Sequence, residues 1–435
     1  MRELLKNNLL VFGFFLLASL AVWTLASVFF WKDDWFFLRA FLNGEEGFVA
    51  GKTFVSDVKP FFKYVMNFEF TYFGERYYLY NYLSIGLFSL WCFSLFILFT
   101  EILKERLIAF SISALVLVNP SNFMNLHCIF QQTELIHLIF LSLFLLFLFR
   151  ARHKSLLYLL FSALSLIAAH FFFPNSLLLP FAGILFLFLF GFSRQHRIIG
   201  SMLFLGVFGL LFFHYSLLSS KYALFEGDHA INLVQAFLFS IHYSGISFLR
   251  LLLYTVNVYP AVISLIAGTA VIGSFFYLHF RLRDEERKIN IFMFFVLILC
   301  TGTVAIAREG NQVLYYYSQL HLIPILWVSY QLFSLIALPF FQKSILQKAL
   351  VPATAIYLLG ALFQIQYSKQ FFSHRNSMNR HITEKNIAEE AVTEIYDEPI
   401  AAEEMKKYKD AYIEYNSERG PKALAALISG LKRIH

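Results

Sequence analysis

The chain has 435 residues, of which 59% are hydrophobic and 19% aromatic, while only 14% carry charge. Its mean hydropathy of +0.64 lies far outside the range of water-soluble domains. The 55 phenylalanines are spread along nearly the whole length, so the bulk of the chain is expected in lipid. The net charge of +7 resides in short clusters between hydrophobic runs, a pattern that indicates membrane orientation rather than nucleic-acid binding.

Apolar runs separated by polar breaks predict an all-α bundle of about eleven membrane-spanning helices, since one span needs ~20 apolar residues. The first run is longer than the ~7–15-residue apolar core of a signal peptide, so it is predicted to be a retained span. Pro260 is a candidate break within the eighth span. The expected spans lie at residues 8–30, 79–101, 106–119, 133–149, 155–173, 176–193, 198–218, 249–280, 289–306, 313–337 and 347–366.

Lysine and arginine are enriched in every second connection between these runs. By the positive-inside rule this predicts a cytoplasmic N-terminus, and an odd number of spans then places the C-terminal tail outside. The other connections carry carboxylates, histidines and aromatics, so any chemistry is expected on the outer face. The basic residues of the inner side are Lys104, Arg106, Arg150, Arg152, Lys154, Arg194, Arg197, Arg281, Arg283, Arg287, Lys288, Lys343 and Lys348.

The composition becomes polar and charged after about residue 369. Residues 1–368 are therefore predicted as a transmembrane domain, and residues 369–435 as a small extracytoplasmic tail. Leu424, Leu427 and Leu431 recur at helical spacing, so the tail is expected to contain helices. Residues 371–435 are the candidate surface for docking a protein partner.

Two adjacent carboxylates, Asp33 and Asp34, follow the first apolar run. Carboxylates at a membrane boundary are costly to desolvate, so they are expected to face water, a partner or a substrate cavity. They also fit a plain interfacial role, because Trp31 and Trp35 flank them as an aromatic belt would. Oxygen ligands suit a hard cation, so Asp33 and Asp34, with Glu134, are candidate ligands for Mg²⁺ or Mn²⁺.

The first outer loop has its features in a fixed order: the first span, Asp33-Asp34, an amphipathic segment, Lys59-Pro60, Phe73-Gly74, Asn81 and the second span. This order resembles the GT-C class of membrane glycosyltransferases, which includes protein O-mannosyltransferases and the bacterial aminoarabinose transferases that modify lipid A. A Lys-Glu pair frequent in that class is absent, and His170 to Asn175 stands in its place. Looser matches continue in the expected order at Asn119-Pro120, Glu134, Pro180, Arg308-Glu309, Tyr315–Tyr317 and Pro324.

The resemblance implies transfer of a sugar from a polyprenyl-phosphate carrier to a lipid, glycan or protein acceptor, on the outer face of a bacterial inner membrane. Asp33 or Asp34 falls where the class has its catalytic base. A phosphate leaving group needs cationic partners, so Arg308, with Lys59 or Arg76, is expected to hold the donor phosphate. Each of these cations also fits a snorkelling role at the interface. The expected substrate contacts are Glu134, Asn81, His170 and Tyr316.

Two other functions stay open from the sequence. A transporter or lipid flippase would place ionisable residues or broken helices near mid-membrane, in two related halves. A non-catalytic scaffold subunit would keep the GT-C-like fold and dock a partner through the tail. Glu134 and His137 share a helix face, so they are expected either to pair with each other or to contact substrate.

Overall fold

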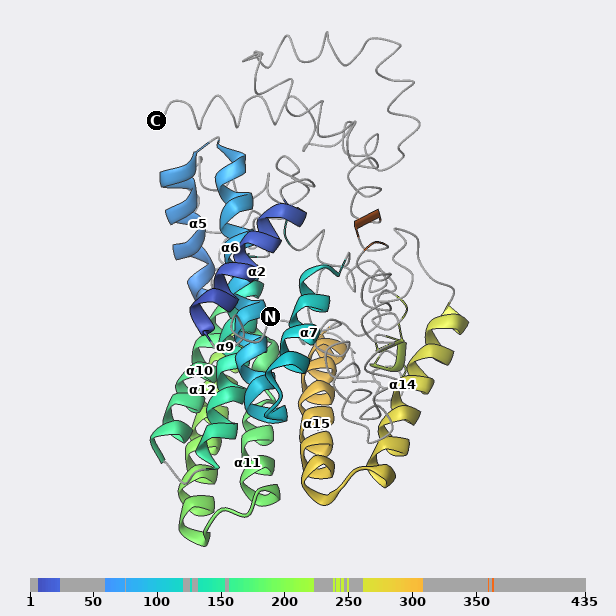
Figure 1. Cartoon of the computed structure of the whole chain (residues 1–435). Coiled ribbons are helices and arrows are strands. Elements are labelled where there is room, and N and C mark those ends of the chain that lie inside the picture. Colours follow the sequence, from blue (N-terminus) through green and yellow to red (C-terminus); the bar gives the residue numbers. More distant parts are fainter. Residues whose placement is uncertain are drawn as a thin grey trace.

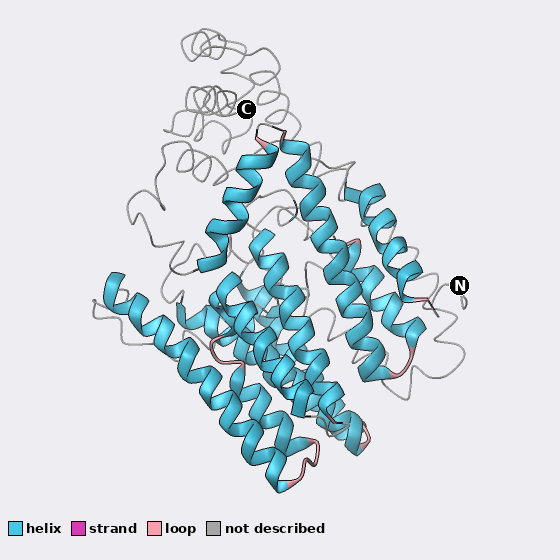
Figure 2. Cartoon of the chain, turned by 90° about the vertical axis from the view of Figure 1, so that its left-hand side faces the viewer, coloured by secondary structure: helices cyan, strands magenta, loops and turns pink. Residues whose placement is uncertain are grey.

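The computed structural model describes residues 7–23, 59–74, 76–119, 126, 132–152, 156–222, 238, 240–242, 244–245, 249, 261–307, 359 and 362–363. Within these residues all regular structure is helical, as Figure 2 shows, which confirms the all-α class. The predicted site residues Asp33, Asp34, Arg308 and Tyr316 lie outside the described residues, and so does the tail at 369–435.

The described helices lie along the predicted apolar runs, and one further helix, α5, lies between the first and second of these runs (Figure 1). Helix α14 is described from Ala261, and the candidate break at Pro260 lies outside the described residues. The elements are α2 (Asn8–Trp23), α5 (Pro60–Phe73), α6 (Tyr77–Leu103), α7 (Arg106–Leu117), α9 (Gln132–Ala151), α10 (Leu156–Phe172), the 3-10 turn η4 (Pro174–Ser176), α11 (Pro180–Leu189), α12 (Arg194–Tyr222), α14 (Ala261–Arg281) and α15 (Asp284–Ala307).

Among the described residues, three helical stretches are long and apolar enough to cross a membrane: Tyr78–Leu103, Gln132–Ala151 and Arg194–Leu217. The apolar stretches in α2, α7, α10, α11 and α14 are shorter, at 10–17 residues. The exposed side chains of α12 include Ile198, Met202 and Phe213, as a lipid-facing helix requires. These helices are compatible with a membrane protein, while the predicted number of about eleven spans is not confirmed.

The sequence predicts one span at 176–193, and this stretch has a different structure. It consists of the end of η4, a turn at 177–179 and the ten-residue α11, which begins at Pro180. Proline is favoured in the first turn of a helix and disfavoured in its interior, so Pro180 places a helix start inside the apolar run. At 1.5 Å per residue, α11 is about 15 Å long, roughly half the hydrocarbon thickness of a bilayer.

Helix α9 lies at the centre of the described bundle, between α6 and α10. Helices α2 and α7 pack on α6, α12 packs on α10 and α11, and α15 packs on α11 and α14. Phenylalanine rings fill these interfaces: Phe15 stacks on Phe110 at 5.4 Å, and Phe186 contacts Phe149 and Phe292 at 5.1 and 4.9 Å between ring centroids. In a membrane, where lipid tails are as apolar as these rings, close packing rather than water exclusion would hold such helices together.

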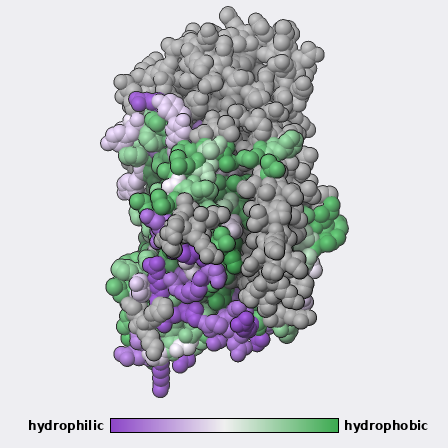
Figure 3. All heavy atoms as spheres, viewed as in Figure 1, coloured by the Kyte–Doolittle hydropathy of each residue, from purple (hydrophilic) through white to green (hydrophobic). Residues whose placement is uncertain are grey.

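Four turns rich in basic residues meet at one end of the bundle, here called the basic end; they follow α6, α9, α11 and α14. Arg152 forms an ion pair with Glu285 at the start of α15, and its guanidinium lies 4.6 Å from the ring centroid of Phe190 at the end of α11. Arg150 Nε lies 3.9 Å from Glu101 Oε2 at the end of α6. These contacts join turns that the positive-inside pattern assigns to the same side of the bundle. Figure 3 shows hydrophilic residues gathered over the lower part of that view.

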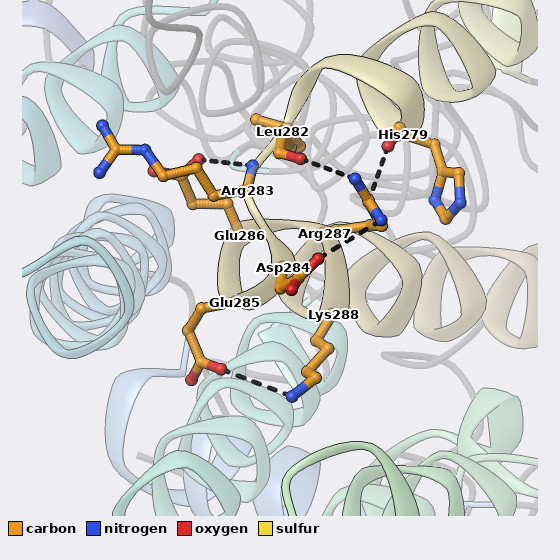
Figure 4. A network of polar contacts seen from close by, with 8 residues as sticks. All are labelled: His279, Leu282, Arg283, Asp284, Glu285, Glu286, Arg287 and Lys288. Atoms are coloured by element: carbon orange, nitrogen blue, oxygen red, sulfur yellow. Dashed lines mark hydrogen bonds and ion pairs between the residues drawn. The ribbon is translucent and has the colours of Figure 1, made fainter.

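The turn between α14 and α15 shows how this end is held (Figure 4). The guanidinium of Arg287 donates to the carbonyl oxygens of His279 at 3.0 Å and Leu282 at 3.2 Å, which are carbonyls at the end of α14. Glu286 accepts a hydrogen bond from the backbone N–H of Arg283 at 3.3 Å. Because helix ends leave backbone groups without partners, these side chains stabilise the turn on both sides.

Cysteines placed at the two ends of the bundle are expected to react from opposite sides of the membrane. Suitable exposed positions are Thr71 on α5, at the end opposite the basic turns, and Gln195 at the start of α12. In a background with Cys92, Cys128 and Cys300 replaced by alanine, a membrane-impermeant maleimide should label one variant in intact cells and the other only after lysis. Labelling of both variants from the same side would contradict this orientation of the helices.

Candidate functional site

Buried polar side chains gather at the end of the bundle opposite the basic turns, here called the polar end. They come from α5, from the starts of α6 and α9 and from the end of α10, and α5 contacts each of the other three helices (Figure 1). Ionisable groups are rarely buried in an apolar helix bundle unless they are paired or functional. The buried members are Glu69, Asn81, Gln132, Thr133, Glu134, His137 and His170.

Helices α5 and α6 form a hairpin that shapes one side of this end. Pro60 begins α5, and Gly74, with φ of 55°, turns the chain after Phe73, a backbone conformation that glycine adopts without strain. The hydroxyl of Tyr80 donates to the carbonyl oxygen of Gly74 at 2.9 Å and thereby closes the hairpin. The fold thus brings the fully buried Glu69 side chain beside the start of α6.

Helix α9 is attached to this hairpin through its first residue. Gln132 Nε2 donates to the carbonyl oxygen of Tyr80 at 3.1 Å, and the Gln132 side chain is fully buried. A carbonyl oxygen only accepts, so this bond fixes the orientation of the Gln132 amide. Asn81 and Glu134 are buried next to these two residues in sequence, which places both predicted substrate contacts at the polar end.

Lys59 directly precedes α5, as its N-cap residue. Its ammonium lies 4.2 Å from the ring centroid of Phe173 and 6.0 Å from that of Phe62. It is also within electrostatic range of the His137 ring. A cation over an aromatic face at this distance is stabilised by about 0.5–2 kcal/mol, depending on its exposure. The predicted phosphate contact Lys59 is therefore brought to the same region as Glu134 and His137.

His137 does not make the side-chain pair that its spacing from Glu134 suggests. Its Nδ1 lies 2.9 Å from the carbonyl oxygen of Ala169 on α10, so this ring nitrogen binds across the helix interface. Glu134 remains within electrostatic range of the ring. Their spacing on α9 thus keeps Glu134 and His137 close together, while the His137 ring makes its hydrogen bond with Ala169 on α10.

His170, which stands where the GT-C class has its acidic pair, is fully buried at the end of α10. Its Nε2 lies 3.2 Å from Nδ1 of His214 on α12, and the two rings meet nearly at right angles, with centroids 5.4 Å apart. Two neutral imidazoles can share one hydrogen bond in this arrangement. The predicted substrate residue His170 therefore belongs to the same polar end as Lys59.

Arg76 is placed differently from Lys59, the other predicted phosphate contact among the described residues. It is exposed in the turn between α5 and α6, and its backbone N–H donates to the carbonyl oxygen of Phe73 at 3.0 Å. Within the described residues, no cluster of three or more histidine, cysteine, aspartate and glutamate side chains could hold a metal ion. The Mg²⁺ or Mn²⁺ site predicted on Asp33 and Asp34 lies outside the described residues and stays a prediction.

Glu69 is a candidate functional residue that the sequence analysis missed. It lies on α5 with Phe62, Met66 and Phe70, which are all buried, so a carboxylate occupies the inward face of an amphipathic helix. The i, i+4, i+7 spacing of Phe62, Met66 and Glu69 was the signal that could have revealed it. An acidic group on the apolar face of a membrane-boundary helix is a functional candidate for the same reason as Asp33 and Asp34.

Among the described residues, the polar end combines the Lys59 ammonium, buried carboxylates and buried imidazoles beside apolar helices. Such a set can bind an amphipathic ligand, since the cation suits a phosphate, the carboxylates and ring nitrogens suit hydroxyl groups, and the helices suit a hydrocarbon tail. Comparison of the sequence with models of protein families and with curated proteins finds no match.

Proposed function

We propose that the chain is a membrane glycosyltransferase of the GT-C type. It takes a sugar from a polyprenyl-phosphate carrier and transfers it to a lipid, glycan or protein acceptor at the polar end of the bundle. The observation that carries this proposal is the position of Lys59, Glu134, His137 and His170 together at one end of an apolar helical bundle. A polyprenyl-phosphate sugar has the matching parts: a hydrocarbon tail, an anionic phosphate and a hydroxylated head.

The chemistry requires charge stabilisation and proton removal. As the bond from the sugar carbon to the phosphate oxygen breaks, negative charge grows on the phosphate, and a positioned ammonium stabilises it. Lys59 serves this purpose in the proposal, together with Arg308 as suggested by the resemblance. Asp33 or Asp34 removes the proton from the acceptor hydroxyl, the role of the acidic residue that the class carries in its first outer loop.

The proposal includes a membrane arrangement. About eleven spans form the domain at 1–368, the N-terminus is cytoplasmic, and the polar end together with the tail at 369–435 faces the outside of a bacterial inner membrane. The meeting of four basic turns at the other end supports this orientation.

A transporter would also bury ionisable residues within membrane helices. The described residues favour a transferase, because Glu134 and His137 lie in the first two turns of α9 and His170 in the last turn of α10. This places the buried groups near one face of the bundle rather than at its middle, where a transported substrate would bind.

The test is retention of polyprenyl phosphate and its sugar conjugate by the purified protein in native mass spectrometry, followed by a transfer assay. Arg308→Ala should lose the carrier, whereas Asp33→Asn with Asp34→Asn should retain it and transfer no sugar. Arg283→Ala, at the basic end, is the matched control and should behave as wild type. Full transfer by the double aspartate variant would refute the assigned base, and a stable partner protein without carrier retention would favour the scaffold function.

A further inference from the structure

The hydrogen bond of His137 fixes the state of its ring. The carbonyl oxygen of Ala169, at 2.9 Å from Nδ1, can only accept, so Nδ1 carries the proton. In the neutral ring the other nitrogen, Nε2, then holds a lone pair and accepts hydrogen bonds. The side chain is 4% exposed, so this acceptor is held in the interior of the polar end rather than in bulk water.

His170 offers a second buried nitrogen beside it. Its Nε2 is used in the contact with His214 at 3.2 Å, and its Nδ1 is buried with no hydrogen-bond partner in the described part of the chain. Buried polar nitrogens nearly always have a partner, so an unpartnered one indicates a missing group. The side chain of His170 is fully buried, and it lies one residue after Ala169, to which His137 is bonded.

Glu134 and Lys59 complete the surroundings of these rings. Glu134 precedes His137 by three residues on α9, and its carboxylate is within electrostatic range of the ring, as is the Lys59 ammonium. His137 and His170 are also within electrostatic range of each other. Lys59 lies over Phe173, whose ring meets that of His137 edge to face at 5.7 Å between centroids. Lys59 and these hydrogen-bonding groups therefore lie in the same region of the described bundle.

We propose that His137, Glu134 and His170 form a subsite that binds the hydroxyl groups of the donor sugar. His137 Nε2 and the Glu134 carboxylate accept hydrogen bonds from hydroxyl groups, and Nδ1 of His170 bonds a further one. The inference rests on the proposed function, because Lys59 then holds the phosphate that adjoins the sugar. The histidines at this position are thus specificity residues that distinguish a sugar-bearing carrier from the bare polyprenyl phosphate.

The matched variant is His137→Asn. The asparagine amide can keep the hydrogen bond to Ala169, while it removes the ring nitrogen that would contact the sugar. His170→Gln tests the same subsite from α10, because the longer amide can keep the contact that Nε2 makes with His214 while it removes Nδ1. The control is His196→Asn at the basic end, where the ring Nδ1 lies 2.6 Å from Ser193 Oγ. Native mass spectrometry then measures the retention of the sugar conjugate relative to bare polyprenyl phosphate.

Wild type and His196→Asn are expected to prefer the sugar conjugate. His137→Asn and His170→Gln should each lower that preference about tenfold, the usual effect of leaving one buried hydrogen-bonding group unpaired, while they retain bare polyprenyl phosphate as wild type does. An unchanged preference in both variants would overturn the subsite and leave the proposed function intact. If one variant elutes as aggregate in size exclusion, the other one decides.

Failure of the proposed function has a different signature, which is a wild type that retains neither carrier. The subsite is then tested by comparing the retention of an alkyl glycoside with that of an alkyl alcohol of the same chain length in native mass spectrometry. A preference for the glycoside that His137→Asn abolishes supports a hydroxyl-binding site on its own. Equal retention of glycoside and alcohol by wild type overturns it.

Discussion

Replacing Gly268 with alanine is expected to disrupt the packing of α14 severely. A Cβ atom built at Gly268 would lie 1.9 Å from the carbonyl oxygen of Ile241, and one at Gly245 would lie 1.9 Å from that of Ser264. Both obstacles are backbone atoms, which cannot move aside as a flexible side chain does. His242 Nδ1 lies 2.7 Å from Ser264 Oγ at the same crossing, so close approach and a hydrogen bond occur together.

The measurement is the midpoint of thermal unfolding in detergent, followed by fluorescence-detected size exclusion. Gly273→Ala is the matched control on the same helix, since its added Cβ would meet nothing within 4 Å. Overpacking costs about 1–3 kcal/mol and occasionally more, whereas alanine in open space favours a helix by up to about 1 kcal/mol. Gly268→Ala should therefore unfold well below Gly273→Ala. Equal midpoints would show that the two segments do not approach closely.

The sequence predicts the helices well where an apolar run ends in charged residues. The run at 133–149 becomes α9 and the run at 289–306 becomes part of α15. In an apolar environment the backbone N–H and carbonyl groups have no water to bind, so a helix, which satisfies them internally, is favoured. The candidate break at Pro260 lies outside the described residues and stays a prediction. Within the described residues, the all-α class and the helix positions follow from composition.

The predicted span at 176–193 is not confirmed, because its length had to be judged through a proline. The run at 176–193 is apolar enough for a span, yet Pro180 starts a helix within it and α11 ends at Leu189. Hydropathy averages over a window and does not register where hydrogen bonding is interrupted. Helix α5 was expected only as an amphipathic outer segment, and the inward position of Glu69 appears once its neighbours Phe62 and Met66 are seen to be buried.

The candidate site was predictable only in part for a similar reason. Spacing along one helix relates Glu134 to His137, but it cannot show that His137 binds Ala169 on another helix. The contact between His170 and His214 joins residues 44 apart in sequence, so it depends on how α10 packs against α12. The resemblance to the GT-C class suggested Lys59 as a phosphate contact from its place in the sequence. Only tertiary packing brings its ammonium within electrostatic range of the His137 ring.

Replacing Lys59 with methionine is expected to weaken retention of polyprenyl phosphate about tenfold or more. Methionine keeps much of the side-chain volume next to Phe173 and removes the charge that lies 4.2 Å from its ring centroid. A hydrogen bond to a charged group contributes about 1.5–3 kcal/mol, and each 1.4 kcal/mol is about tenfold in affinity. Retention is measured by native mass spectrometry at fixed ionic strength, because salt screens exposed charges.

Lys104→Met is the control for this change. Lys104 is a 66% exposed side chain at the basic end, where it forms an ion pair with Glu101, so its loss removes the same formal charge far from the polar end. Reduced retention in both variants would indicate a general effect of net charge. Normal retention in Lys59→Met would separate Lys59 from the phosphate and leave Arg308 as the cation to test. A loss confined to Lys59→Met would place the phosphate beside Phe173, because in the described chain that ring is the aromatic face nearest to the ammonium.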